Sequence, residues 1–139
     1  MIEIDRALTD QRLLGPALGD SASWSTWIVV LRAAFGLSLD ERELELFATV
    51  AGDRKPPSQR VRELWCVAGR RSGKSHIAAA LAVFLALFAK HKLSRGDRKM
   101  CLVISGSVDQ SKTVFNYIRG FLEAARCWRR RSQASRGMR

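Results

Sequence analysis

The 139-residue chain has little of what disulfide frameworks, metal sites and membrane spans require. Its three cysteines are odd in number and widely spaced, and only two histidines accompany them, so neither disulfides nor a zinc motif is predicted. The most apolar run, Ile77–Ala89, is too short to cross a bilayer and predicts a buried helix. The opening residues are acidic and resemble no secretory signal. We therefore expect a cytoplasmic protein that does not associate with membranes.

Acidic residues are also scarce, with 13 against 24 lysines and arginines, and the net charge is +11. Much of this excess lies in residues 126–139, which contain several arginines and no acid. Two interpretations of this tail stay open: it binds nucleic acid through phosphates, or it is a disordered end. The rest of the chain is only mildly basic, so charge alone does not identify a nucleic-acid-binding protein.

A phosphate-binding loop is the most informative feature that the sequence does contain. The residues are Ala68, Gly69, Arg70, Arg71, Ser72, Gly73, Lys74 and Ser75, with alanine where the strict motif has its first glycine. Successive backbone N–H groups leading into a helix offer a polar cradle for clustered negative charge. Lys74 is expected to reach the β- and γ-phosphates of ATP, and the Ser75 hydroxyl to ligate Mg²⁺. We predict a nucleotide-binding set that runs from Ala68 to His76.

The segments around this loop predict a strand before it and a helix after it. Val61–Ala68 is rich in β-branched and aromatic residues, and the stretch from Ser75 to about Lys92 is rich in alanine and leucine. A second strand is predicted over Met100–Ser105, followed by a helix from Val108 to about Ala125. Free cysteines in these two strands would behave as small apolar residues. The order implies an α/β fold, a parallel sheet of the P-loop NTPase type with flanking helices, incomplete because two strands are too few.

Two further helices are predicted upstream of the sheet. One spans Trp24–Phe35, with Ser23 as N-cap and Gly36 closing it. The other begins at Asp40, where Glu43 completes a capping box, and ends near residues 51–52. Ser107 and Gln110 are likewise expected to form a capping-box pair at the start of the last helix, whose inner face is Val114, Ile118, Phe121, Leu122 and Ala125. Three regions follow: a helical lead-in and linker (1–60), a partial ATPase core (61–125) and the basic tail (126–139).

Three stretches of the chain together resemble the N-terminal ATPase region of a phage terminase large subunit, the motor that packages viral DNA. They are residues 35–47, the loop 69–75 with its double arginine, and residues 103–122, especially 109–118. The likeness covers about residues 24–125, in the family's order. It implies ATP and Mg²⁺ as ligands and double-stranded viral DNA as substrate. It also implies portal and small terminase subunits as partners, a ring of identical subunits, and the bacterial host cytoplasm as location.

The resemblance assigns roles to some residues of the loop. Arg70 matches the arginine that the family places near the γ-phosphate, so Arg70 and Lys74 are the candidate catalytic residues. Lys74 and Ser75 match the pair that binds phosphate and Mg²⁺. Gln59 corresponds either to an adenine-contacting glutamine or to an ordinary solvated loop residue.

The sequence departs from the family downstream of the loop. An apolar strand ending in Asp-Glu is expected there, to hold Mg²⁺ and to activate water. After Ser75 the acids are Asp97, Asp109 and Glu123, and none forms such a pair. The family's nuclease domain has no counterpart either, and the likeness stops near Ala125. We therefore expect a truncated ATPase region that binds ATP and does not hydrolyse it by itself, and a frameshift or premature stop would explain the ending.

Two other functions remain as alternatives. A small basic DNA-binding protein would use the arginine-rich tail, with salt-dependent binding that does not need the loop. A P-loop kinase for nucleotides or metabolites would use the loop and an acceptor-binding lid, and no lid segment is evident in the sequence.

Overall fold

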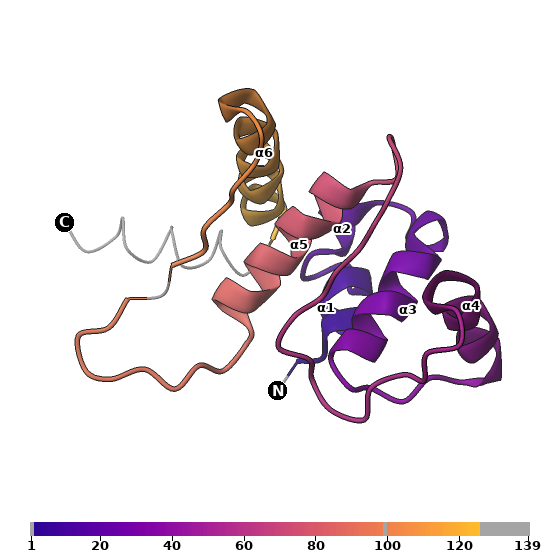
Figure 1. The fold of residues 1–139 in the computed structure, drawn as a ribbon. Helices are drawn as coiled ribbons and strands as arrows, with labels where there is room; N and C mark the ends of the chain where they lie inside the picture. Colours follow the sequence, from indigo (N-terminus) through magenta and orange to yellow (C-terminus); the bar gives the residue numbers. More distant parts are fainter. Residues whose placement is uncertain (1, 99, 126–139) are drawn as a thin grey trace. The chain divides into compact units, whose positions relative to one another are not determined.

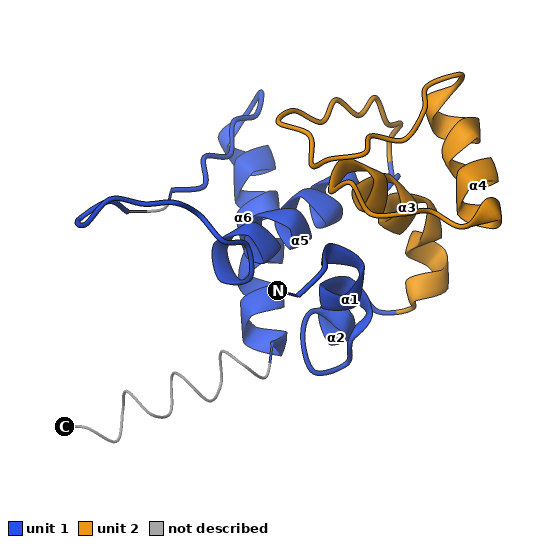
Figure 2. Cartoon of the chain, turned by 90° about the horizontal axis from the view of Figure 1, so that it is seen from below, with its two compact units in different colours: residues 1–19, 71–139 blue, residues 20–70 orange. Residues whose placement is uncertain are grey.

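The computed structural model describes residues 2–98 and 100–125, and all regular structure in these residues is helical (Figure 1). The chain divides into two compact units (Figure 2). Residues 20–70 carry α3 (Ser25–Ala34) and α4 (Glu41–Ala51) and are named the α3–α4 unit. Residues 1–19 and 71–139 carry α5 (Lys74–Leu87) and α6 (Val108–Ala124) and are named the α5–α6 unit. The predicted α/β fold with a parallel sheet is therefore wrong for the described residues.

The α3–α4 unit begins with a 3₁₀ turn, η1 (Ser21–Trp24), and not with the predicted helix start at Trp24. The Asp20 carboxylate accepts the Ala22 N–H and caps this turn. The N-cap of α3 is Trp24, without a side-chain cap bond, so the predicted Ser23 cap is wrong. Helix α3 follows directly and ends where Gly36 adopts a φ of 70°. The end of the helix is thus as predicted, because only glycine enters this left-handed region at low cost.

The predicted capping box of α4 is confirmed. The Glu43 N–H donates to the Asp40 carboxylate (2.8 Å), and the Asp40 N–H donates to the Glu43 carboxylate (3.0 Å). Glu43 also pairs with Arg32 of α3 at 3.4 Å. One side chain thus both starts α4 and links it to α3.

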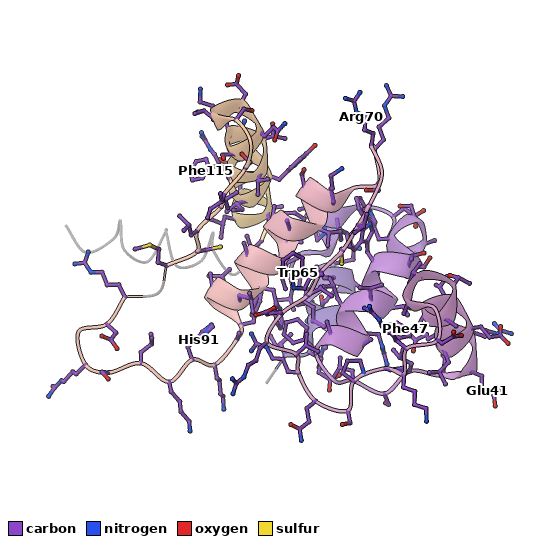
Figure 3. The ribbon with its side chains drawn as sticks, in the orientation of Figure 1. Glu41, Phe47, Trp65, Arg70, His91 and Phe115 are labelled. Atoms are coloured by element: carbon purple, nitrogen blue, oxygen red, sulfur yellow. The ribbon has the colours of Figure 1, made fainter. Side chains whose placement is uncertain are left out.

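The core of this unit is small and lies between α3 and α4. Val29 and Ala33 of α3 pack with Phe47 of α4, which Figure 3 labels on the inner side of its helix. Partly buried leucines and an alanine complete the cluster: Leu39, Leu46 and Ala51. So few buried side chains make α3 and α4 interdependent, since neither helix buries its apolar face alone.

The chain after α4 folds back on the end of α3. The Val61 N–H donates to the Ala34 carbonyl (2.8 Å), and the Arg60 guanidinium lies over the Phe35 ring at 5.0 Å. A Cβ at Gly36 would come within 2.7 Å of the Gln59 backbone, so this close approach requires glycine. The segment predicted as a linker is therefore docked at its downstream end.

The α5–α6 unit has two short helices, α1 (Ile4–Thr9) and α2 (Gly15–Leu18), besides its two long ones. Helix α5 is apolar nearly all round and buries residues along its whole length: Ile77, Ala79, Ala80, Val83 and Phe84. Helix α6 packs mainly against α5, with α2 as a second neighbour, and α1 also contacts α5. Without a sheet, the apolar surface of α5 is covered by other helices.

Helix α6 is amphipathic, as its sequence predicts. Its inner face carries the expected residues, of which Phe121 and Ala125 are buried and Val114, Ile118 and Leu122 half-buried. The Ser107 side chain accepts the Gln110 N–H at its start, which confirms one half of the predicted capping-box pair. The reciprocal bond, from the Ser107 N–H to the Gln110 side chain, is not formed in the described residues. Helix α5, in contrast, ends at Leu87, before the predicted end near Lys92.

Neither predicted strand forms, and most of the apolar side chains expected inside a sheet are exposed. Trp65 is 88% exposed, and Leu102 is 74% exposed. No hydrogen bond joins the backbone of residues 100–104 to another described residue. Cys66 and Cys101 are exposed as well, so the prediction that they act as buried apolar residues is wrong. A strand depends on partners beside it, and these two segments have none in the described chain.

Candidate nucleotide-binding loop

The predicted loop lies where the two units join along the chain. Residues 68–70 belong to the α3–α4 unit, and residues 71–75 belong to the α5–α6 unit. Ala68 is half-buried and Gly69 exposed, and Arg70 extends outward at the tip of the loop (Figure 3). Helix α5 begins at Lys74, which confirms that a helix follows the loop directly. The strand that should precede the loop is absent.

The turn before α5 has an unusual backbone. Gly73, the N-cap of α5, has φ 79° and ψ 5°, which is the left-handed conformation. Arg71 has φ 61° and is the one non-glycine residue with positive φ among residues 2–98 and 100–125. Such a conformation costs a non-glycine residue about 1–2 kcal/mol. Left-handed residues in a turn gather successive N–H groups on one side, which is the backbone arrangement that anion sites use.

The start of α5 brings the two chemically specific residues of the loop together. The Gly73 carbonyl accepts the first hydrogen bond of the helix, from the Ile77 N–H (3.0 Å). The N–H groups that precede Ile77 therefore lie at the start of the helix and point along its axis. Lys74 is the first helical residue and is exposed, and Ser75 follows and is half-buried. An ammonium and a hydroxyl at the positive end of a helix are groups that suit a phosphate and its Mg²⁺.

Ser72 is half-buried and Arg71 exposed, so the loop combines a covered turn with two outward arginines. Arg71 and Lys74 are both exposed near the start of α5, and their positive charge favours an anionic ligand. The residues present therefore fit a phosphate group bound to Mg²⁺, on the evidence of the left-handed turn and of this donor set.

The His76 side chain is turned into the fold and not toward the loop. Its Nε2 lies 3.2 Å from the Ala17 carbonyl oxygen, and its ring contacts Tyr117 and Phe121 with centroids at 4.7 and 4.8 Å. Of His76, only the backbone N–H is therefore left as a candidate for contact with the nucleotide. Sequence reasoning missed this packing role, although Tyr117 and Phe121 are spaced four apart on α6 and form one strip of its surface.

The acids downstream of the loop have local partners. Asp97 accepts the Ser94 N–H (2.9 Å), Asp109 lies 3.5 Å from Lys112, and Glu123 bonds Arg119 (2.8 Å). This bond and the Glu123 charge raise the pKa of the Arg119 guanidinium. Each of these carboxylates serves a turn or the surface of α6. Gln59, the other candidate, is exposed beside Gly36 in the α3–α4 unit.

A basic segment follows α5 in the same unit. Residues 90–98 run outward from the helix and return toward α6 as an open connection (Figure 1). The cationic side chains in it are all exposed: Lys90, Lys92, Arg95 and Arg98. The histidine between them, His91, lies beside the end of α5, with Nε2 2.8 Å from the Leu85 carbonyl oxygen (Figure 3). The arginine-rich tail, residues 126–139, lies outside the described residues.

The described residues offer neither a cluster of metal ligands nor a membrane-spanning helix. No group of three or more histidine, cysteine, aspartate or glutamate side chains in them could hold a metal ion. No helix in the same residues is long and apolar enough to cross a membrane. The described residues therefore contain no candidate for a metal site built from protein side chains alone.

The family resemblance has no support from comparisons with known proteins. Comparison of the chain with protein-family models, with curated proteins and with solved structures finds no match.

Proposed function

We propose that this chain binds Mg²⁺-ATP through the loop Ala68–Ser75, as the nucleotide-binding part of a viral DNA-packaging motor. The observation that carries the proposal is the start of α5 at Lys74, directly after a left-handed Gly73. A helix start with an ammonium and a hydroxyl in its first turn is suited to phosphate, and the sequence of the loop fits the phosphate-binding motif.

Each residue of the loop has a role that follows from its chemistry. Lys74 supplies positive charge to the terminal phosphates, and the Ser75 hydroxyl is a hard oxygen ligand for Mg²⁺. The backbone of residues 69–73 donates N–H groups, and Arg70 adds a second positive charge from the tip of the loop. ATP bound in this way would place its charge at the positive end of α5.

The motor assignment rests on the resemblance of residues 35–47, 69–75 and 103–122 to terminase large subunits. Double-stranded DNA, the portal, the small terminase subunit and a ring of identical subunits are the partners that this assignment implies. We expect binding with little turnover, because Asp97, Asp109 and Glu123 are engaged locally and none is positioned as an Asp-Glu pair.

Isothermal titration of Mg²⁺-ATP into the wild-type chain and the Lys74→Ala variant tests the binding proposal. Loss of a charge-assisted contact is expected to weaken binding about 10- to 100-fold. Lys92→Ala is the matched control, since this lysine is exposed outside the loop and its removal should leave the affinity unchanged. Equal affinity in all three proteins would refute the role of the loop. Steady-state ATP turnover well above that of Lys74→Ala would refute the expected inactivity.

The exposed basic segment 90–98 supports a second candidate, binding to nucleic acid through phosphates. Affinity for duplex DNA would then fall steeply as salt rises and would be insensitive to Lys74→Ala. Replacing Lys90, Lys92, Arg95 and Arg98 by glutamine should reduce the salt dependence. If deletion of residues 126–139 alone abolishes binding, the tail and not this segment is responsible.

A further inference from the structure

The first turn of α5 is connected to two other helices through one side chain. The ring of His76 lies against Tyr117 at a near-perpendicular angle of 80° and against Phe121 at 49°, and its Nε2 reaches the Ala17 carbonyl of α2 (3.2 Å). His76 follows Ser75 directly. A half-buried ring one residue beyond the predicted Mg²⁺ ligand thus contacts both α2 and α6.

The hydrogen-bonding pattern defines which nitrogen of His76 carries hydrogen. A carbonyl oxygen only accepts, so Nε2 must donate to Ala17, and the ring orientation is set by this bond. The perpendicular contact with Tyr117 is a favourable geometry for two aromatic rings. One contact with α2 and two contacts with a single strip of α6 therefore restrict the ring, and with it the backbone of the first helical turn.

The other buried side chains of α5 are apolar and cannot form hydrogen bonds: Ile77, Ala79, Ala80, Val83 and Phe84. The turn before the helix contains Arg71 in a left-handed conformation, which persists only where the surroundings constrain it. A constraint close to Arg71 is thus needed, and His76 lies only five residues away.

We propose that His76 is a positioning residue, whose ring holds Lys74 and Ser75 in place by docking the start of α5 on α2 and α6. This inference rests on the proposed function, because it assumes that the loop binds phosphate. It adds that phosphate binding and the packing of α6 are coupled. By thermodynamic reciprocity, a ligand that orders the loop also tightens the contact of His76 with Tyr117.

The chain has one tyrosine, so Tyr117 is a unique reporter of this coupling. Protein labelled with 3-fluorotyrosine gives one ¹⁹F signal, from α6. Titration with Mg²⁺-ATP is expected to shift this signal in the wild type, with the same midpoint as calorimetry. His76→Ala should lose the shift and bind ATP about tenfold more weakly, a usual size for coupling between sites.

Three further variants separate positioning from general damage to the fold. His76→Phe keeps a ring without the bond to Ala17 and should restore part of the ¹⁹F shift. His91→Ala removes the other histidine, outside the contact, and should respond as the wild type does. Lys74→Ala should move the midpoint of the shift to a higher ATP concentration, by the same factor by which it weakens binding. An unchanged shift and affinity in His76→Ala, with helicity intact by circular dichroism, overturns the proposal.

Failure of the proposed function gives a different pattern. If calorimetry detects no ATP binding to the wild type, the Arg71→Gly substitution is used in place of ATP to perturb the loop. Glycine adopts the left-handed conformation at low cost, so this substitution relieves the backbone strain at position 71. The Tyr117 signal should then differ between Arg71→Gly and wild type, and this difference should vanish in the His76→Ala background. A difference of the same size in both backgrounds, or no difference in either, contradicts the positioning role independently of ATP.

Discussion

Phe121 should be the side chain on which the α5–α6 unit depends most. It is 1% exposed, heads the largest fully buried side chains of the described residues, and contacts the His76 ring at 4.8 Å. Phe121→Ala removes that ring from the contact between helices and leaves a cavity, at a cost of about 3–5 kcal/mol in the free energy of unfolding. Domains of this size are stable by only about 5–15 kcal/mol, so this loss is a large share.

Phe115→Ala is the matched control, since Phe115 is on the same helix and is 65% exposed (Figure 3). Both substitutions gain the same helix propensity, about 0.5 kcal/mol, which cancels in the comparison. The control should lose about 1 kcal/mol or less, because little of its ring leaves water on folding.

Urea denaturation followed by circular dichroism at 222 nm measures the difference. With a urea dependence of about 1.5 kcal/mol per M, Phe121→Ala should lower the midpoint by about 2 M or more. If this variant is unfolded without urea, Phe121→Leu serves instead, with a smaller loss that should still exceed that of Phe115→Leu. Equal shifts at both positions would refute the packing of α6 on α5 described above.

Three other changes test separate features of the chain. Asp40→Ala removes the capping box of α4 and should cost about 1 kcal/mol in the tryptophan-monitored urea transition, whereas Asp53→Ala, beyond the helix, should cost little. Leu102→Lys places a charge in an uncharged, exposed, strand-prone segment and should reduce concentration-dependent self-association in light scattering. Leu93→Lys adds the same charge outside that segment, and an equal effect there would contradict the explanation. The Cys66 residue is exposed, but neighbouring atoms partly desolvate its thiol and raise the pKa. In a variant with serine at the other two cysteines, alkylation of Cys66 should therefore require a higher pH in the folded protein than in urea.

Local sequence patterns predicted the helical parts of this chain well. The capping box at Asp40, the side-chain cap at Ser107, the glycine that closes α3, and the apolar face of α6 are formed as expected. Each depends on residues within a few positions of one another, and a helix closes its hydrogen bonds within its own segment. The start of α5 at Lys74 was predictable for the same reason, because the loop motif and the alanine-rich run that follows it are both local features of the sequence.

The other features of the fold depend on contacts between residues far apart in the chain, and the sequence did not predict these contacts. Residues 61–68 and 100–105 have the composition of strands, yet a strand exists only where another strand accepts its backbone hydrogen bonds, and no such pairing forms in the described residues. The place of His76 between Ala17 and two aromatic rings was equally invisible, since its partners lie far away in the chain. The sequence alone thus determined a Gly-Lys-Ser turn that leads directly into a helix, because the turn and the helix start are both local features. Only the tertiary structure decided that helices cover α5 in place of a sheet, because its apolar surface must be buried by whatever elements the chain brings against it.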